Sequence, residues 1–455
     1  MPARLLLPVL LVACDSTPTD SGGDPSLSAT AALAEAIPTV LVVDYTAPSG
    51  AADVWVEWGL TDRFGHRTRV GAGGTGRGAV VGLHAETDYT WRLVAEVDGA
   101  ELTSEAEVVH TGPGQQFIGD LTVASPGDPT FGYFLTTTLG HDANVVMFDA
   151  EGAPVWWLQA GEGAVFSEVR LMPDGRGVLL QQMDGYRESD IGAVLAYAWD
   201  GTLLSNTRTP GAHHDFVVGR DGRYAYCSTD TRMTDVDGVE TSVVGEALRE
   251  VPAGGAEADI VTVWTSWDTL PVRVDAETDS GFYPEGLDWV HCNGLAYLPE
   301  SDDYLMSAYE LRSVLQIDAA SGALDWVFGG FDNQFDLEGT RNFREVHSPE
   351  PVEGGFRLFI NRSGDPLVSR VGHFELDTTT MVATELPSIE LDGEYYSYIL
   401  GDSNAIPGGN TLVSWGSAGV FTEVDADGAL VWSGSAGIGT IVGFSELVAA
   451  PGGPL

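Results

Sequence analysis

The sequence predicts an all-β protein in which a six-bladed β-propeller follows a small β-sandwich. Short runs of alternating apolar and polar residues, bounded by Gly, Asp and Pro, fill the 455-residue chain, and long stretches of helical periodicity are hard to find. A weak internal repeat of roughly 45–55 residues runs through the last two thirds of the chain. The strand types at the two ends of this repeat complement each other, which indicates a closed ring.

The first unit is expected over residues 36–112, where about seven short strands fit a β-sandwich. Within residues 83–95, Leu83 precedes Tyr89 by six positions and an alternating strand follows. This stretch resembles the tyrosine corner of fibronectin type III domains, so the unit is predicted to be immunoglobulin- or fibronectin III-like. Its simplest role is that of a spacer or a lid beside the main domain.

The second unit, residues 117–455, repeats a strand, a turn with Pro, Gly or Asp, and a second apolar strand. Six instances of this pattern begin at Phe166, His213, His291, His347, Gly401 and Phe444. About four strands in each repeat are typical of a propeller blade. Residues 131–158 lack a first strand and residues 444–453 lack the later strands, so together they complete the sixth blade. Such closure removes exposed sheet edges.

The N-terminus is predicted to be a signal peptide, residues 1–14. Arg4 precedes a short apolar run that is too short to cross a bilayer. Residues 11–14, Leu-Val-Ala-Cys, resemble the bacterial lipobox, in which the cysteine (here Cys14) is lipidated; the alternative is a signal peptide with an incidental cysteine. Residues 15–35 are polar and expected to form a disordered tether. These features predict an exported protein, anchored by lipid alone in the bacterial cell envelope, on the periplasmic or outer surface.

The charge balance excludes several classes of function. The chain has 67 acidic and 21 basic residues, a net charge of −46, and every basic residue is Arg. Nucleic acid is therefore excluded as a partner, because phosphates need a basic surface. The absence of Lys also excludes Schiff-base lysine chemistry and a Walker lysine. Strong acidity is typical of solubility in a salty or extracellular medium.

Two further patterns concern cysteines and acidic turns. Export favours oxidation, so Cys227 and Cys292 either form a disulfide or remain as buried free thiols. The Asp-rich residues 234–238 and 425–428 lack the later Glu of a calcium loop, and we interpret them as hairpin turns.

Three of the nine histidines mark a candidate site. His213, His291 and His347 begin the first strand of three successive repeats, and in a propeller that strand lines the central channel. Asp215 and Asn293 lie two residues after a histidine and are expected to share its face. The three histidines could be bonded within the channel packing, bind zinc, or surround an oxyanion and supply a nucleophile.

The ordered set of motifs resembles the bacterial arylsulfotransferases over most of residues 117–455. The motifs are His-His-Asp-Phe at 213–216, Asp-Trp-Val-His-Cys-Asn-Gly-Leu-Ala-Tyr at 288–297, Trp-Val-Phe-Gly-Gly at 326–330, Val-His-Ser-Pro at 346–349, Asn-Ala-Ile-Pro-Gly-Gly-Asn-Thr-Leu at 404–412 and Glu-Val-Asp-Ala-Asp-Gly-Ala-Leu-Val-Trp at 423–432. The resemblance implies a six-bladed propeller with a small N-terminal β-domain. It also implies a sulfate ester and a phenol as small-molecule substrates, and no cofactor.

The same resemblance implies the role of each histidine in a ping-pong sulfuryl transfer. His347 falls on the family's nucleophile and would carry the group as sulfohistidine. The His213/His214 pair and His291 fall on the two histidines that hold the sulfuryl group. Fixed donors around its oxygens would stabilise the charge that develops in the transition state.

The chain departs from the family pattern beside these histidines. Tyr309 stands where the family has Arg, and a Tyr hydroxyl offers neither a charge nor a bidentate fork. Arg362 occupies the same strand position one repeat later, within the altered motif Phe-Ile-Asn-Arg at 359–362. We therefore expect Tyr309 and Arg362 to bind substrate together with Asn293 and Asp215. Two other functions stay open: a non-catalytic propeller that binds a ligand or envelope partner, and a metal-dependent enzyme using the same histidines.

Overall fold

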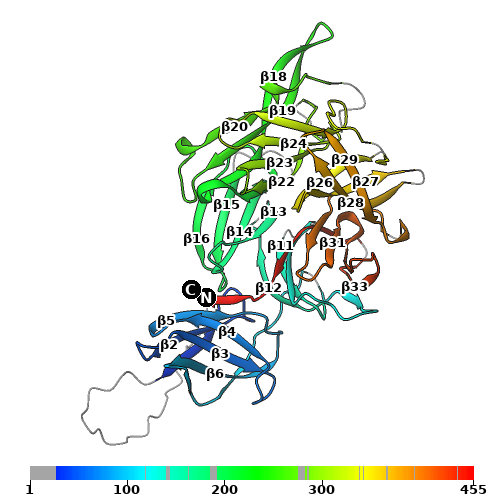
Figure 1. The fold of residues 1–455 in the computed structure, drawn as a ribbon. Coiled ribbons are helices and arrows are strands. Elements are labelled where there is room, and N and C mark those ends of the chain that lie inside the picture. The colour runs from blue at the N-terminus through cyan, green and yellow to red at the C-terminus, as the bar shows by residue number, and fades with distance from the viewer. Residues whose placement is uncertain are drawn as a thin grey trace, which may run out of the picture.

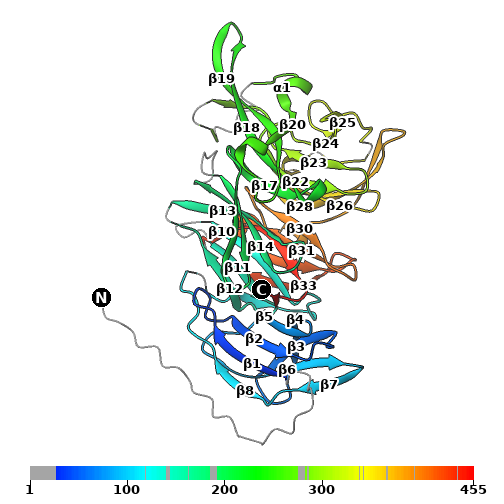
Figure 2. The ribbon, with the colours of Figure 1, turned by 90° about the vertical axis from the view of Figure 1, so that its left-hand side faces the viewer.

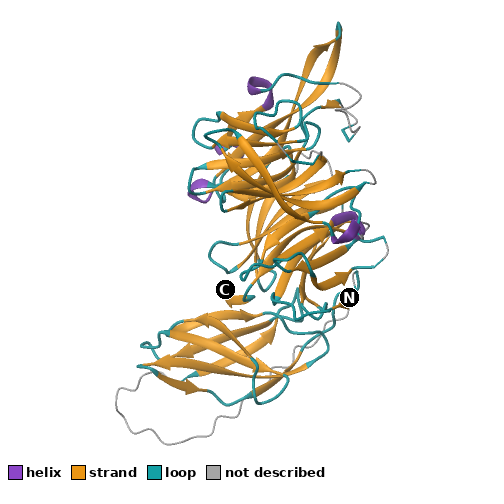
Figure 3. Ribbon diagram, turned by 45° about the vertical axis from the view of Figure 1, so that its right-hand side comes forward, coloured by secondary structure: helices purple, strands orange, loops and turns teal. Residues whose placement is uncertain are grey.

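The prediction of an all-β protein is confirmed. The computed structural model describes residues 27–117, 119–139, 144–161, 163–184, 192–274, 282–283, 286–337, 339–341, 343–364, 367–393, 395–437 and 439–455. Strands dominate these residues (Figure 3), and the helical pieces are α1 (Ser266–Thr269) and three-residue 3-10 turns. No helix within the described ranges has the length and apolarity needed to cross a membrane. The predicted signal peptide, Cys14 and residues 15–26 of the tether lie outside the described residues.

The N-terminal unit has two facing sheets, drawn in blue in Figure 1. The first contains β1 (Ser28–Leu33), β2 (Leu41–Ala47) and β5 (Gly74–Val80). The second contains β3 (Asp53–Gly59), β4 (His66–Gly71), β6 (Asp88–Val97), β7 (Ala100–Thr103) and β8 (Glu107–His110). Alternate residues of both sheets, among them Val43, Val56 and Leu93, form a common core. The Tyr89 hydroxyl accepts a hydrogen bond from the His84 amide at 3.0 Å.

The predicted start of this unit, at residue 36, is wrong. Residues 28–33 were expected in the disordered tether, but they form β1 and pair with β2 along its whole length. The edge of β2 carries backbone groups that need partners, and the adjacent chain supplies them. Leu27, Ala29 and Leu33 also pack against the core of the unit. The tether therefore ends before residue 28.

Six more sheets follow along the described chain, and five of them consist of consecutive strands. The first is made of β13 (Ala164–Leu171), β14 (Gly177–Asp184), β15 (Ala193–Ala198) and β16 (Leu203–Arg208). The second is made of β17 (Ala212–Val218), β18 (Tyr224–Val236), β19 (Val239–Val251) and β20 (Val261–Thr265), with β21 (Leu287–Asp288) beside β19. The third is made of β22 (Cys292–Leu298), β23 (Asp303–Ala308), β24 (Ser313–Asp318) and β25 (Leu324–Gly329).

The remaining two consecutive sheets continue this order. One is made of β26 (Phe343–Val352), β27 (Gly355–Ser363), β28 (Val368–Asp377) and β29 (Val382–Ile389). The other is made of β30 (Asp402–Ala405), β31 (Thr411–Trp415), β32 (Val420–Val424) and β33 (Leu430–Ser435), to which β9 (Thr122–Ala124) is added. Both acidic stretches lie at hairpin turns, as expected: residues 237–238 connect β18 to β19 in the hairpin that projects from the top of Figure 1, and residues 425–428 lie in the turn between β32 and β33.

The sixth sheet joins the two ends of this part of the chain. It contains β10 (Tyr133–Leu139), β11 (Asn144–Asp149), β12 (Pro154–Gln159) and β34 (Ile441–Val448). β34 pairs with β10 in antiparallel register, with Tyr133 opposite Val448. The first strands of successive sheets contact one another, so the six sheets form a closed arrangement.

The chain end departs from the expected strand at 444–453. The strand in the ring stops at Val448, and after Pro451 the chain forms β35 (Gly452–Pro454). β35 pairs with β5 of the N-terminal unit, with Gly452 opposite Val80, as the red end of the chain in Figure 1 shows. Proline has no amide hydrogen to give to a ladder, which favours a strand end at this point. The first sheet of the N-terminal unit thus includes a strand from the C-terminal end of the chain.

Other contacts also fix the N-terminal unit against the six sheets, end to end as in Figure 2. Thr39 donates a hydrogen bond to the Val155 carbonyl at 2.8 Å, and His84 lies 2.7 Å from a carboxylate oxygen of Asp149. Ile37 belongs to the same hydrophobic cluster as the large buried rings of the neighbouring sheets. Strand pairing, polar contacts and apolar packing therefore all join the two units.

The two cysteines for which the sequence allows either a disulfide or free thiols form a disulfide. Cys227 of β18 and Cys292 of β22 are bonded to each other, and both are fully buried. The bond connects two neighbouring sheets of the ring. It lies one residue from His291, so it also fixes the chain beside the candidate site.

Candidate functional site

The histidines of three neighbouring sheets gather with aromatic side chains. The ring of His291 lies 4.8 Å from that of His214 and 6.4 Å from that of His213, between centroids. Tyr309 lies between His291 and His347, at 5.4 Å and 6.1 Å. The rings of Phe282 and Tyr283 lie 4.9 Å and 5.7 Å from that of His291. The structure therefore brings together the four predicted histidines and Tyr309.

Irregular backbone places these side chains. The register of β17 shifts between Ala212 and Phe216, that of β22 between Cys292 and Gly294, and that of β26 between His347 and Pro349. His214 and His291 have φ values of 55° and 57°, in the left-handed region that non-glycine residues seldom occupy. Bulges re-aim side chains, and such backbone strain is concentrated at functional sites.

His347 is held as a neutral imidazole. The side-chain amide of Asn361 donates to the carbonyls of Ser397 and Leu400 at 3.0 Å and 2.7 Å, so its oxygen faces His347 Nδ1, 2.7 Å away. Nδ1 must then carry the hydrogen, and Nε2 presents its lone pair, toward which the Leu400 amide points at 3.3 Å. Burial lowers the pKa of His347 to about 3, against the effect of Asn361 and with a further contribution from His291. At neutral pH Nε2 is therefore a free base.

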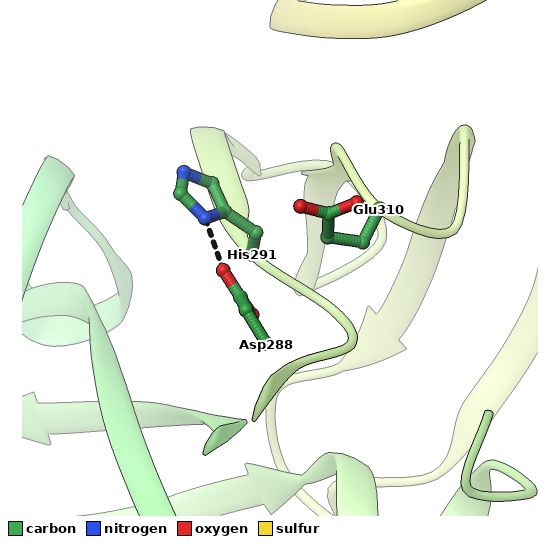
Figure 4. A group of neighbouring side chains, drawn as sticks. All are labelled: Asp288, His291 and Glu310. Carbon is green, nitrogen blue, oxygen red and sulfur yellow. Dashed lines mark hydrogen bonds and ion pairs between the residues drawn. The ribbon is translucent and has the colours of Figure 1, made fainter. Parts of the chain in front are cut away.

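The pKa of His291 is shifted in the opposite direction to that of His347. Burial lowers its pKa, but the charge and hydrogen bond of Asp288, with the charges of Glu310 and Glu246, outweigh burial and raise the pKa above the usual value. Asp288 contacts Nδ1, and Figure 4 shows Nε2 on the side of the ring away from Asp288. A protonated His291 would thus present an N–H to the space between the rings.

The three-histidine zinc site has no counterpart in the described part of the chain. There, one group of His, Cys, Asp or Glu has three ligand atoms within 4.8 Å of one another: Asp288, His291 and Glu310, drawn in Figure 4. It contains only one of the three aligned histidines. Its Asp288 oxygen is hydrogen-bonded to His291 Nδ1, so we interpret the group as a buried acid–imidazole cluster.

His213 and His214 differ in how they can contact a ligand. His213 is fully buried; its Nδ1 lies 2.8 Å from His214 Nδ1 and its Nε2 lies 3.1 Å from a carboxylate oxygen of Glu246. Both ring nitrogens of His213 are therefore engaged, and His214 is the member of the pair that faces the other rings. Burial, followed by the charges of His291, His213 and His347, holds the pKa of His214 well below its ordinary value.

Tyr309 and Arg362 are connected through a carboxylate. The hydroxyl of Tyr309 is hydrogen-bonded to Glu345, and burial, with the charges of Glu345 and Glu310, raises the pKa of Tyr309. Arg362 pairs with Glu345 at 2.7 Å, and its side chain is 42% exposed. Tyr309 thus lies among the histidines, whereas Arg362 reaches the site through Glu345.

Asp215 was wrongly expected to face the histidines. Its carboxylate accepts hydrogen bonds from Arg170 at 3.0 Å and from the Leu295 amide at 2.7 Å. These groups line a separate cavity of about 570 Å³, together with Glu350, Asp402 and Glu446. The bulge between Ala212 and Phe216 breaks the alternation that would have given His213 and Asp215 a common face.

Asn293 lies at a bulge of the same kind. It follows Cys292, where the register of β22 shifts, and only 2% of the residue is exposed. Its side-chain oxygen is buried and makes no hydrogen bond to the described residues.

Four residues without a predicted role complete the site. Asp288, Glu246, Asn361 and Glu345 each contact one of the predicted side chains. A signal existed for Asp288, which precedes His291 by three residues in the recognised motif, and for Asn361 in the altered motif. Glu246 and Glu345 carry no such signal, because they come from β19 and from the start of β26, outside the recognised motifs.

If the site carries out the sulfuryl transfer that the resemblance implies, Asp288→Asn is expected to move the alkaline limb of the activity profile to lower pH and to lower kcat/KM about 10²-fold. The raised pKa of His291 means that its proton is present below that pKa and lost as pH rises through it. Without the Asp288 charge the proton leaves at lower pH. The check is kcat/KM for an aryl sulfate against pH, with Asp303→Asn, a buried carboxylate of β23, as control. An unshifted limb would show that His291 acts unprotonated.

Comparisons with known proteins give distant structural likenesses and one family match. No curated protein matches the chain. Among solved structures, a periplasmic gluconolactonase from Pseudomonas aeruginosa is 13% identical with a TM-score of 0.43, covering 70% of this chain and 99% of that one. A Bacteroides caccae protein of unknown function is 13% identical with a TM-score of 0.39, covering 71% and 99%. The β-propeller domain of Myceliophteria thermophila Cps50 is 13% identical with a TM-score of 0.36, covering 69% and 88%.

The family assignment comes from the sequence of the ring itself. A family model described as Arylsulfotransferase (ASST) matches residues 120–435, which include every histidine of the site and all strands of the six ring sheets except β34. The match extends over more than half of the chain. The chain therefore belongs to the arylsulfotransferase (ASST) family.

Proposed function

We propose that the protein transfers a sulfuryl group from an aryl sulfate ester to a phenol through a sulfohistidine at His347. The observation that carries this proposal is the state of His347: Asn361 fixes the hydrogen on Nδ1 and leaves Nε2 as the free base. The family to which the chain belongs supports a sulfotransferase-like enzyme.

Two half-reactions make up the proposed transfer. In the first, the Nε2 lone pair of His347 attacks the sulfur, the bond from sulfur to the aryl oxygen breaks, and the phenolate leaves. In the second, the oxygen of the acceptor phenol attacks the sulfur, the S–N bond breaks, and the phenol gives up its proton. A covalent intermediate divides one difficult displacement into two easier ones.

Charge and shape around His347 suit this chemistry. A protonated His291 would stabilise the negative charge on the sulfuryl oxygens, since fixed donors act most strongly where water is excluded. Phe282, Tyr283 and Tyr309 surround His291 with aromatic rings, which favour an aryl substrate. Tyr309 would contribute a polar contact in place of the family's Arg.

The proposal extends to architecture and location. We infer that the six sheets are the blades of a six-bladed β-propeller and that the N-terminal unit is a fibronectin III-like sandwich. Export and lipid anchoring through Cys14 remain proposals from the sequence; the disulfide between Cys227 and Cys292 supports an oxidising compartment.

The test is turnover of a chromogenic aryl sulfate by the purified protein, with and without a phenol acceptor. We expect faster release of the chromophore with acceptor, a sulfated acceptor, and, without acceptor, one sulfuryl group on the peptide containing His347 by mass spectrometry. Loss of activity on chelation, restored by a divalent metal, would favour the metal-dependent enzyme. Binding of the ester without turnover would favour the ligand-binding propeller. Either result would overturn the proposal.

A further inference from the structure

We infer that Glu246, His213 and His214 form a proton relay that takes the proton of the acceptor phenol and returns it to the leaving phenolate. This inference rests on the proposed sulfuryl transfer. It assigns the transfer of the phenol proton, which His347 and His291 do not carry out. The relay begins at His214, whose ring lies 4.8 Å from that of His291, and ends at a carboxylate inside the β17–β20 sheet.

Hydrogen bonds connect Glu246, His213 and His214 in series. One carboxylate oxygen of Glu246 accepts the Cys292 amide hydrogen at 2.9 Å, and the other lies 3.1 Å from His213 Nε2. Since a carboxylate only accepts, Nε2 of His213 donates to it. Nδ1 of His213 and Nδ1 of His214 lie 2.8 Å apart, so these two nitrogens share one hydrogen. A proton that reaches His214 therefore has a continuous path to Glu246.

The burial of these hydrogen-bonded groups is energetically unfavourable, which suggests a functional role. Glu246 is 2% exposed and His213 is fully buried. Among the described residues, the ion pair of Glu246 is with His213 alone. Burying a carboxylate costs several kcal/mol unless it is well paired. A buried acid behind an imidazole that leads to the reacting group is the arrangement by which hydrolases orient a base and stabilise its protonated form. The left-handed backbone of His214 turns its ring toward His291.

The reaction requires such a group. When the phenol oxygen attacks the sulfur and the S–N bond breaks, its hydrogen passes to Nε2 of His214. The hydrogen on Nδ1 of His214 moves to Nδ1 of His213, and the positive charge comes to lie beside the Glu246 carboxylate. In the first half-reaction of the next cycle the path runs in reverse: the hydrogen on Nδ1 of His213 returns to Nδ1 of His214, and Nε2 of His214 gives the stored proton to the departing phenolate oxygen, which leaves both rings neutral again. No atoms or electrons are gained or lost over the cycle.

The neighbouring groups are less suited to this task. His347 is bonded to the sulfur when the acceptor attacks. Asp288 raises the pKa of His291 and so favours the protonated form, which is a poor proton acceptor. The Tyr309 hydroxyl is hydrogen-bonded to Glu345. His214 is the neutral imidazole in the group that is connected to a carboxylate through a second ring.

The relay is tested with Glu246→Gln, which keeps the size of the side chain and an oxygen for the Cys292 amide. The first half-reaction is measured as the single-turnover release of 4-nitrophenol from 4-nitrophenyl sulfate, a weakly basic leaving group. The second is measured as transfer from the sulfurylated enzyme to phenols of graded acidity. We expect release within about threefold of the unaltered protein, and transfer to weakly acidic phenols about 10²-fold slower. The loss should shrink as the acceptor becomes more acidic.

The matched control is Glu250→Gln, a buried carboxylate on the same strand that pairs with Arg223 and accepts from Tyr304. It should leave the dependence of transfer on acceptor acidity unchanged. If Glu246→Gln folds poorly, His214→Asn, at the other end of the relay, should show the same steepened dependence. Equal losses in both half-reactions, or an unchanged dependence in both relay variants, would overturn the relay. Absence of any release or sulfurylated His347 in the unaltered protein would instead overturn the sulfuryl transfer on which it rests.

Discussion

His347→Ala should lower kcat/KM for sulfuryl transfer by about 10⁴-fold or more, equivalent to about 5.5 kcal/mol of transition-state stabilisation. The substitution removes the only atom that the mechanism bonds to sulfur, so donor and acceptor would have to react directly. The remaining donors give a small residual rate, as in other enzymes that lose their nucleophile. The measurement is transfer from an aryl sulfate to a phenol, with the sulfurylated peptide followed by mass spectrometry.

The matched control is His373→Ala, which removes a half-buried imidazole from β28 in the same sheet. Its turnover should stay close to that of the unaltered protein. Turnover retained by His347→Ala, or a sulfuryl group found on another peptide, would show that His347 is not the nucleophile. Asn361→Leu offers a second check. Without the acceptor for Nδ1–H, the hydrogen of His347 can lie on Nε2 instead, and Nε2 then has no lone pair to attack the sulfur. The first half-reaction should therefore be slower.

Removal of the disulfide by Cys227→Ala with Cys292→Ala should lower the free energy of unfolding by about 4 kcal/mol. The bond closes a loop of 65 residues, and the chain-entropy relation for such a loop gives a stabilisation of this size. Alanine is the appropriate replacement, because a serine hydroxyl would be buried without a partner at these fully buried positions.

The measurement is urea unfolding of the oxidised protein, the reduced protein and the double variant. The reduced protein and the variant should unfold at similar urea concentrations, both below the oxidised protein. Equal stability of all three would mean that the bond adds nothing to the folded state. The variant should also transfer more slowly to weakly acidic phenols, because the disulfide holds the backbone segment whose residue-292 amide donates to Glu246.

Periodicity made much of the fold predictable. Alternation and turn residues mark the strands, and the repeat places His213, His291 and His347 at equivalent positions. Equivalent positions in a closed repeat converge, so the histidines could be grouped from the sequence alone. The rings of His213 and His291 lie 6.4 Å apart, and Tyr309 lies between His291 and His347, which agrees with this grouping.

Local backbone irregularity limited the prediction of individual roles. A strand of strict alternation would place Asp215 on the face of His213, but the bulge in β17 sends it to Arg170 instead. Bulges have no firm sequence signature, so this error follows from their nature. Glu246 could not be found for another reason: it comes from β19, and only the pairing of β17, β18 and β19 brings it to His213.

The pairing of β35 with β5 has a consequence for biosynthesis. The N-terminal sheet is complete only with residues 452–454, which are synthesised after all the strands of the six ring sheets. Domains generally fold as they emerge, N-terminal first, but here one edge of the N-terminal unit stays open until residues 452–454 have been made. β35 therefore completes the N-terminal unit only after the whole ring can form, and it couples the folding of the two units in time.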